Sequence, residues 1–198
     1  MKSKNPNHPK KGQRTTVDPI HQTRDIKAIK LLLSDNPRNL LLFTMGINNG
    51  LRAWDLLKLK VKHVRRLQPG QFIIIKEGKT QKQNILMINK TLYKTIRTFI
   101  NEIRPLDDDY LFASAKTNTP LTIQAVNALI KKWTKTINLP GNYGAHTLRK
   151  TFGYIQRTEY GVGFEVLAKR FNHSSPAITM RYLGLTRQEV KHVLMNDI

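Results

Sequence analysis

Residues 146–182 read HTLRKTFGYIQRTEYGVGFEVLAKRFNHSSPAITMRY. His146 and Arg149 open a segment, 146–158, whose apolar residues recur at helical spacing, and positions three apart lie on one face of a helix. Two shorter helices are predicted at 163–171 and 176–182, with His173-Ser174-Ser175 between them. Tyr182 follows His173 by nine positions. This order predicts a helical substructure in which His146 and Arg149 share one helix face, followed by His173 and Tyr182.

Two upstream segments carry further polar residues. Gly50-Leu51-Arg52 opens a short predicted helix, 51–59, which also carries Asp55. The apolar, β-branched runs 71–75 and 84–88 flank the turn-like stretch Glu77-Gly78-Lys79-Thr80 and predict a β-hairpin. Each segment is weak alone, because patterns such as H-x-x-R recur often by chance.

These residue types fit the cleavage of a phosphodiester. The bond can be broken without a metal when cationic donors neutralise the charge that builds on its non-bridging oxygens. Such a site also needs a nucleophile and an acid that protonates the departing 5′ oxygen. The arginines, histidines, lysine and tyrosine of these segments are therefore candidates for one site.

The combined order is more specific than any of its parts. Gly50-Leu51-Arg52 with Asp55, a Gly78-Lys79 hairpin, His146-x-x-Arg149, His173-Ser174-Ser175 and Tyr182 together resemble the tyrosine recombinase or phage integrase family. The resemblance runs from about residue 18 to the C-terminus. It implies a catalytic domain that cleaves and rejoins DNA in site-specific strand exchange.

The resemblance implies a role for each residue at the phosphate. Arg52 and Arg149 would clamp the scissile phosphate with their planar forks. His173 would contact a non-bridging oxygen. His146 would hydrogen-bond the phosphate or assist proton movement at the tyrosine.

Three further roles concern the bonds that break and form. Tyr182 would attack phosphorus and leave a 3′-phosphotyrosyl bond, which stores the phosphodiester energy, so that rejoining needs neither ATP, metal nor another cofactor. Lys79 would protonate the leaving 5′ oxygen, although Lys76 and Lys82 in the same hairpin remain alternatives. Asp55 would orient the site through hydrogen bonds rather than react.

Composition agrees with a DNA partner. Lys and Arg number 34 against 13 Asp and Glu, a net charge of +21, which favours a polyanion. Membrane surfaces are the rival polyanion, but no basic amphipathic helix or long apolar span supports them. The chain has no cysteine, which excludes disulfides, thiolate zinc sites and cysteine nucleophiles. Without a secretory signal, we expect a cytoplasmic protein. The resemblance implies that it is DNA-associated and of bacterial or phage origin.

The chain is predicted to fold as one domain preceded by an arm. Residues 1–16 are basic and read as a flexible arm, and residues 17–198 form the catalytic domain. The expected class is α+β, mainly α-helical, with a small antiparallel sheet on the 71–88 hairpin and a possible third strand around residues 110–112. The remaining helices are predicted at 25–33, 37–47, 92–103, 123–137 and 187–195.

Several alternatives stay open on sequence grounds. A type IB topoisomerase uses the same chemistry to relax DNA, and a non-catalytic DNA-binding relative would keep only the fold. Tyr143 and Tyr154 compete with Tyr182, but spacing from His173 favours Tyr182. Three adjacent carboxylates, at 107–109, invite a metal site, whereas a solvated loop is the more common use of such a run.

The family resemblance also has departures. Members usually carry a helical core-binding domain ahead of the catalytic one, and here only the arm precedes it, so the chain is interpreted as a fragment or as a naturally short member. Helix 187–195 has an apolar stripe of Val190, Val193 and Leu194. Closing the domain's own core is one use of such a stripe. In the family a terminal segment after the tyrosine often docks on a neighbouring protomer, and the resemblance favours this use and a tetramer on DNA.

Overall fold

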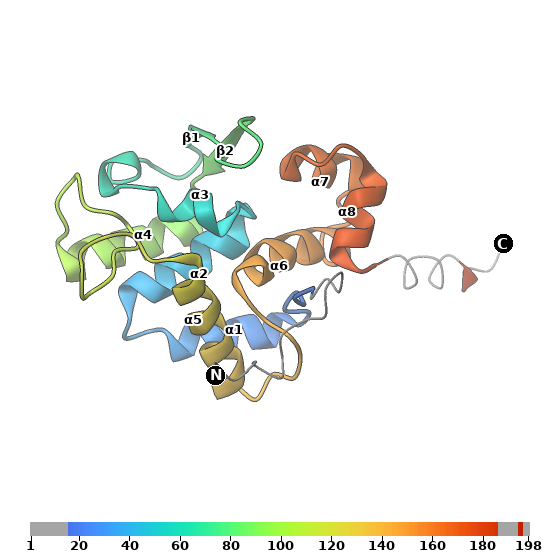
Figure 1. Ribbon diagram of the computed structural model, residues 1–198, viewed down its shortest axis with the longest axis horizontal. Coiled ribbons are helices and arrows are strands. Elements are labelled where there is room, and N and C mark those ends of the chain that lie inside the picture. The colour runs from blue at the N-terminus through green and yellow to red at the C-terminus, as the bar shows by residue number, and fades with distance from the viewer. Residues whose placement is uncertain (1–15, 186–193, 196–198) are drawn as a thin grey trace, which may run out of the picture.

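A computed structural model gives the structure of this chain and describes residues 16–185, 194 and 195. Within these ranges the fold is mainly helical, with one two-stranded antiparallel sheet, which confirms the predicted α+β class. In chain order (Figure 1) the elements are α1 Thr23–Leu32, α2 Pro37–Asn49, α3 Ala53–Leu57, the 3-10 helix η1 Val61–His63, β1 Phe72–Lys76, β2 Gln83–Met87, α4 Lys90–Ile103, α5 Ile123–Thr136, α6 Ala145–Thr158, α7 Phe164–Phe171 and α8 Pro176–Leu183.

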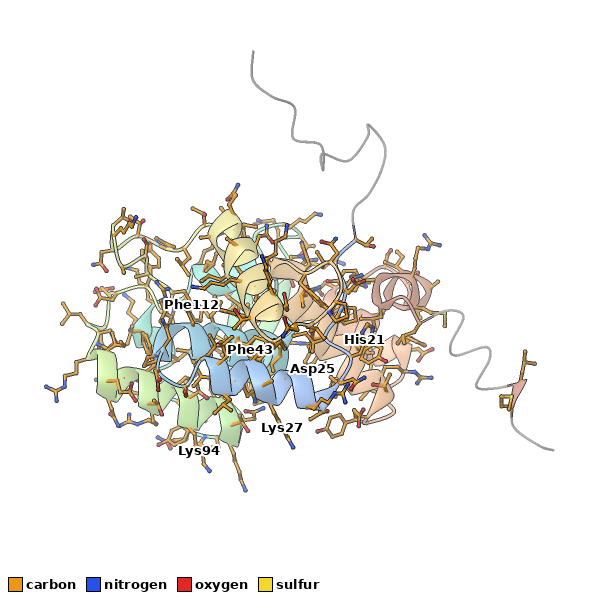
Figure 2. The ribbon with its side chains drawn as sticks, turned by 90° about the horizontal axis from the view of Figure 1, so that it is seen from below. His21, Asp25, Lys27, Phe43, Lys94 and Phe112 are labelled. Atoms are coloured by element: carbon orange, nitrogen blue, oxygen red, sulfur yellow. The ribbon has the colours of Figure 1, made fainter. Side chains whose placement is uncertain are left out.

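Helix α2 lies at the centre of the main core. The Asn36 side chain accepts a hydrogen bond from the backbone N–H of Asn39 at its start, and Gly50 ends it with φ of 60° in the left-handed region that favours glycine. α2 packs on both α4 and α6. Figure 2 shows Phe43 and Phe112 inside this body, where both are fully buried, and Lys94 on its outside. The apolar core therefore holds α2 in place, and residues that contact its C-terminal end at Gly50 are positioned by it.

A second, smaller apolar cluster joins α7 and α8 to α6. It is built from Phe164, Leu167, Phe171, Leu183 and Leu185. In Figure 1 the α7–α8 pair lies beyond α6, on the side away from α4. Gly153 of α6 allows the close approach, because a Cβ there would lie 2.7 Å from Cζ of Phe171 and 2.9 Å from Cδ2 of Leu183. α6 thus belongs to both clusters, and the α7–α8 pair is positioned from it.

The predicted hairpin is present. β1 pairs with β2 in an antiparallel register that sets Phe72 opposite Met87 and Ile74 opposite Ile85. These four side chains are exposed, whereas Leu86 on the other face is buried, as expected for strands with one face on the core. The hairpin tip, residues 77–82, lies on the same side of the molecule as α7 (Figure 1).

The prediction of a third strand around residues 110–112 was wrong. Tyr110 forms only an isolated bridge with Lys60, and the N–H of Leu111 donates to the carbonyl of Leu59. The N–H of Leu121 donates to the carbonyl of Phe112. This apolar run therefore pairs with its two flanking segments and buries Leu111 and Phe112 in the core instead of extending the sheet.

The predicted helices up to residue 182 are all present, with ends that move by no more than two residues. Helix α3 is shorter than the predicted 51–59, because Arg52 is an extended residue that precedes its first turn. The predicted helix 187–195 lies outside the described residues except for Leu194 and Met195, and the arm 1–16 does so except for Thr16.

Candidate active site

Helix α6 places Arg149 in the protein interior. Its side chain is 2% exposed, and its Nη1 and Nη2 donate to the carbonyls of Gly50 and Phe171, each at 2.7 Å. Burial lowers the pKa of the Arg149 guanidinium to about 10, so the group is still a cation at neutral pH. The two carbonyls occupy two of its five N–H groups. Arg149 therefore ties the end of α2 to the end of α7 and keeps donors for another acceptor.

Arg52 and Asp55 connect α3 to the hairpin tip. Nη1 of Arg52 forms an ion pair with the buried carboxylate of Glu77. Oδ1 of Asp55 accepts a hydrogen bond of 2.8 Å from the backbone N–H of Gly78. Because Asp55 is buried, this bond is shielded from water and fixes the hairpin tip beside α3. The tip that carries Lys79 is thus held next to Arg52.

A pocket of about 370 Å³ lies between these elements. Arg52 lines it from the position directly before α3, Trp54 from α3, Lys79 from the hairpin and His146 from α6. Lys76 instead lines a different pocket, together with Lys58 and His63. Of these two hairpin lysines, Lys79 is therefore the one that shares a pocket with the other candidates.

His146 also lines a second pocket, of about 610 Å³, together with Lys150 and Tyr182. The pKa of His146 is lowered mainly because the ring is partly withdrawn from water. Smaller contributions come from the positive charges of Arg149, Arg52, Lys79 and Lys150. His146 is consequently a neutral imidazole near pH 7, at the junction of the pocket with Lys79 and the pocket with Tyr182.

His173 lies in the turn between α7 and α8. Its Nδ1 is 2.9 Å from the hydroxyl of the fully buried Thr179, and its ring meets that of Tyr182 edge-on at 5.3 Å between centroids. Burial and then the charges of Arg149 and Arg52 lower the pKa of His173 to about 4. If the Thr179 hydroxyl donates to Nδ1, the neutral ring carries its proton on Nε2 and can donate there.

Tyr182 packs on the second apolar cluster, with its ring 5.7 Å from that of Phe171. The Nζ of Lys150 lies 5.1 Å from its ring centroid. Its hydroxyl is buried and forms no hydrogen bond of ordinary geometry with the described residues, although the Arg149 guanidinium is near enough to favour the phenolate. Burial raises the pKa of Tyr182 to about 12, although the charges of Arg149 and Arg52 act in the opposite direction. In this state the phenol is protonated at neutral pH.

The structure thus brings all the candidates into one region. Arg52, Lys79 and His146 line one pocket, and His146 and Tyr182 line the next. The ring of His173 contacts that of Tyr182. Arg149 is buried between the ends of α2 and α7. The competing tyrosines lie elsewhere: the hydroxyl of Tyr143 donates to the carbonyl of Pro140, and Tyr154 packs edge-on against His21.

Some residues of this region were missed on sequence grounds. They are Glu77, Asn84, Lys150, Arg170 and Thr179. The one available signal was that Glu77 is a lone acid in a basic hairpin, directly before Gly78-Lys79. Nothing in the sequence separates the other four from ordinary surface residues.

The acidic run at 107–109 behaves as a solvated loop. Asp107 pairs with Arg65, and Asp108 lies 2.7 Å from Nζ of Lys62. The carboxylate of Asp109 accepts from the backbone N–H of Leu106. Within residues 16–185, 194 and 195, no cluster of three or more metal-binding side chains is found. In the same part of the chain, none of the helices combines the length and apolar character required to cross a bilayer.

Comparison with known proteins gives a consistent result. A probable integrase/recombinase of Bacillus subtilis strain 168, YoeC, is 36% identical over 172 residues, which cover 85% of this chain and 90% of that protein. The crystal structure of XerA recombinase superposes with a TM-score of 0.73 at 19% identity, over 94% of this chain and 68% of that one.

A second solved structure, XerH site-specific recombinase bound to palindromic difH substrate in a post-cleavage complex, has a TM-score of 0.70 at 19% identity. The superposition includes 91% of this chain and 53% of the XerH chain. The model of the phage integrase family matches residues 21–189, which include every candidate site residue. This chain therefore belongs to the phage integrase family.

Proposed function

We propose that this protein is a site-specific DNA recombinase, a tyrosine recombinase that cleaves and rejoins DNA through a covalent bond between Tyr182 and a 3′ phosphate. One observation carries the proposal: a half-buried tyrosine, two anchored arginines and two histidines whose pKa is lowered lie together in one region of the structure. The family assignment gives the reaction class, and this geometry gives each residue its part.

The arginines suit a phosphate that gains negative charge. Arg52 and Arg149 each use part of the guanidinium to bind the protein, and the remaining N–H groups can donate to the two non-bridging oxygens. Nε2 of His173 is a third donor. Because these donors are positioned before the phosphate arrives, their reorganisation cost in the transition state is small.

Cleavage and rejoining are each a single displacement at phosphorus. Oη of Tyr182 attacks phosphorus, and the bond from phosphorus to the 5′ oxygen breaks. The phenolic proton passes to neutral His146, which lines the same pocket, and the Lys79 ammonium gives a proton to the departing 5′ oxygen. Attack by a 5′ hydroxyl on the phosphotyrosyl bond reverses both transfers and reseals the strand.

The proposed partner is double-stranded DNA. Support comes from the net charge of +21 and from the structural similarity to XerH, which was solved bound to its difH substrate. Strand exchange requires more than one cleavage at once, so we propose self-association, as a tetramer on DNA. The segment expected to join the protomers, 187–195, lies largely outside the described residues.

A nicked suicide substrate tests the proposal. The duplexes are taken from the sequences that flank the gene, with a nick near the cleavage point so that the released 5′ end diffuses away. Wild-type protein is expected to accumulate a covalent adduct that resists denaturing electrophoresis. Tyr182→Phe is expected to form none while binding the same DNA with nearly unchanged affinity, and Tyr154→Phe serves as the matched control.

An adduct that persists in Tyr182→Phe would assign the nucleophile to another residue. If the wild-type protein yields no adduct on any flanking duplex while binding it, the chain is a DNA-binding relative without the reaction. Relaxation of a supercoiled plasmid that lacks those sequences would instead indicate topoisomerase-like activity.

A further inference from the structure

Glu77 is an acidic residue of this region that is withdrawn from water. It is fully buried at the hairpin tip, and its carboxylate forms the ion pair with Arg52. The Thr80 hydroxyl donates to Oε2 at 2.6 Å, and Nδ2 of Asn84 donates to Oε1 at 2.8 Å. A buried carboxylate is costly unless it is paired and hydrogen-bonded. Here both oxygens have partners, so the anion is held in place.

The pairing restricts the Arg52 guanidinium to one orientation. Glu77 binds Nη1, and no described residue accepts a hydrogen bond from Nε or Nη2 of Arg52. Arg52 also lines the pocket that contains Lys79 and His146. Without the carboxylate, repulsion from neighbouring cations and the flexibility of a long side chain would both disperse the guanidinium. The carboxylate therefore selects the conformation in which the remaining donors face this pocket.

The same hydrogen bonds reach the helix pair that carries Tyr182. Oδ1 of Asn84 accepts from Nη1 of Arg170 at 2.6 Å, and Nδ2 of Asn84 also contacts the carbonyl of Arg170 at 3.2 Å. Arg170 further donates through Nε to the carbonyl of Asn49 at 2.9 Å, at the end of α2. Arg170 directly precedes Phe171, whose carbonyl accepts from Arg149.

We propose that Glu77 is a positioning residue that orients Arg52 for the scissile phosphate, and that Asn84 and Arg170 extend this arrangement to the α7–α8 pair with His173 and Tyr182. The proposal rests on the recombinase function proposed above and adds a residue that does not touch the DNA. One contiguous set of contacts then connects the phosphate clamp to the helix pair that carries the nucleophile.

Glu77→Gln tests the first part, because it keeps the shape and removes the charge. Asp107→Asn is the matched control, since it removes a carboxylate that pairs with an arginine on an exposed loop. Single-turnover adduct formation is measured at saturating nicked DNA, and DNA affinity is measured separately. We expect Glu77→Gln to form adduct about 10- to 100-fold more slowly, by analogy with the loss seen when the hydrogen-bond partner of a metal ligand is removed. Its DNA affinity should change by less than about threefold, and Asp107→Asn should match wild type.

A substrate with an uncharged scissile phosphate separates positioning from a general loss of structure. Replacing one non-bridging oxygen by a methyl group removes the negative charge that Arg52 would neutralise. The rate penalty of Glu77→Gln relative to wild type should therefore shrink at least fivefold on this methylphosphonate, in parallel with the penalty of Arg52→Ala. A penalty that is equal on both substrates would overturn the role through Arg52 and indicate a structural role only.

Asn84→Ala tests the extension to α7 and α8. It interrupts the contacts between Glu77 and Arg170 and should slow adduct formation about tenfold, with melting temperature recorded for each variant. A wild-type rate in Asn84→Ala would refute the link to the helix pair. These outcomes differ from a failure of the proposed function, in which the wild-type protein itself would form no adduct.

Discussion

The stability of the protein in acid offers a test of the Glu77 environment that requires no DNA. Burial alone would raise the pKa of this carboxyl. The hydrogen bonds from Thr80, Asn84 and Asn172 and the charge of Arg52 outweigh that effect and lower the pKa from 4.5 to about 2. A depressed carboxyl pKa stabilises the fold above the unfolded-state pKa, and this stability is lost as the pH falls through the folded-state value.

The shift from 4.5 to about 2 corresponds to about 3 kcal/mol of stability at neutral pH. Linkage places most of the loss between these two pKa values, and by pH 3 about 2 kcal/mol of it should be gone. Glutamine cannot titrate, so Glu77→Gln lacks this component. The difference in free energy of unfolding between wild type and Glu77→Gln should therefore narrow by about 2 kcal/mol from pH 7 to pH 3.

Urea unfolding of both proteins at a series of pH values measures this difference, because all other titrating groups cancel in the subtraction. Asp107→Asn, whose carboxylate pairs on the surface, should differ from wild type by no more than about 1 kcal/mol. A difference between wild type and Glu77→Gln that stays constant with pH would show that folding does not lower the pKa of Glu77. A difference that widens in acid would mean that burial dominates and Glu77 is protonated.

Three further outcomes follow from the site. Arg149→Met leaves two buried carbonyls without their donor, so it should destabilise the fold by about 3 kcal/mol and lower the melting temperature by roughly 6–12 °C in calorimetry, besides abolishing the adduct. Lys79→Ala should slow cleavage of ordinary DNA by about 10²–10⁴-fold, and sulfur in place of the 5′ bridging oxygen should restore most of the rate in a strand-cleavage assay, because a thiolate leaves without a proton. In a Trp133→Phe background, the fluorescence of Trp54, which is 55% exposed at the pocket, should change on DNA titration; an unchanged spectrum at saturation would place the DNA elsewhere.

Local signals in the sequence were sufficient for most of the fold. Asn36-Pro37 and Gly50 delimit α2 because capping and left-handed termination depend on neighbouring residues alone. The hairpin followed from two apolar, β-branched runs that flank a turn-like stretch. The prediction of a third strand was wrong because pairing depends on residues distant in the sequence. Residues 110–112 have strand character, but tertiary packing brings Leu59 and Leu121 beside them instead of the hairpin.

The candidate site divides in the same way. Arg52, His146, Arg149, His173 and Tyr182 could be proposed from spacing and resemblance. The role of Glu77 could not, because its burial depends on Asn84 across the hairpin and Arg170 on α7, and a lone glutamate in a basic turn resembles a solvated one. Hydrogen bonds between residues distant in the sequence produce no periodic pattern from which they could be predicted.

The arginines and the tyrosine of the site differ in their hydrogen bonding, and this difference bears on how the reaction would be controlled. Arg149 is anchored by two carbonyls and Arg52 by a carboxylate, so the groups that would receive the phosphate are fixed before it binds. The Tyr182 hydroxyl is different, since it forms no hydrogen bond of ordinary geometry with the described residues, and its pKa of about 12 keeps it protonated. The cations that lower this pKa are opposed by burial, so movement of α8 that brings the hydroxyl toward the arginines would increase its reactivity. The protein thus fixes the electrostatics of the phosphate site in advance and leaves the position of the nucleophile as the variable that DNA binding can change.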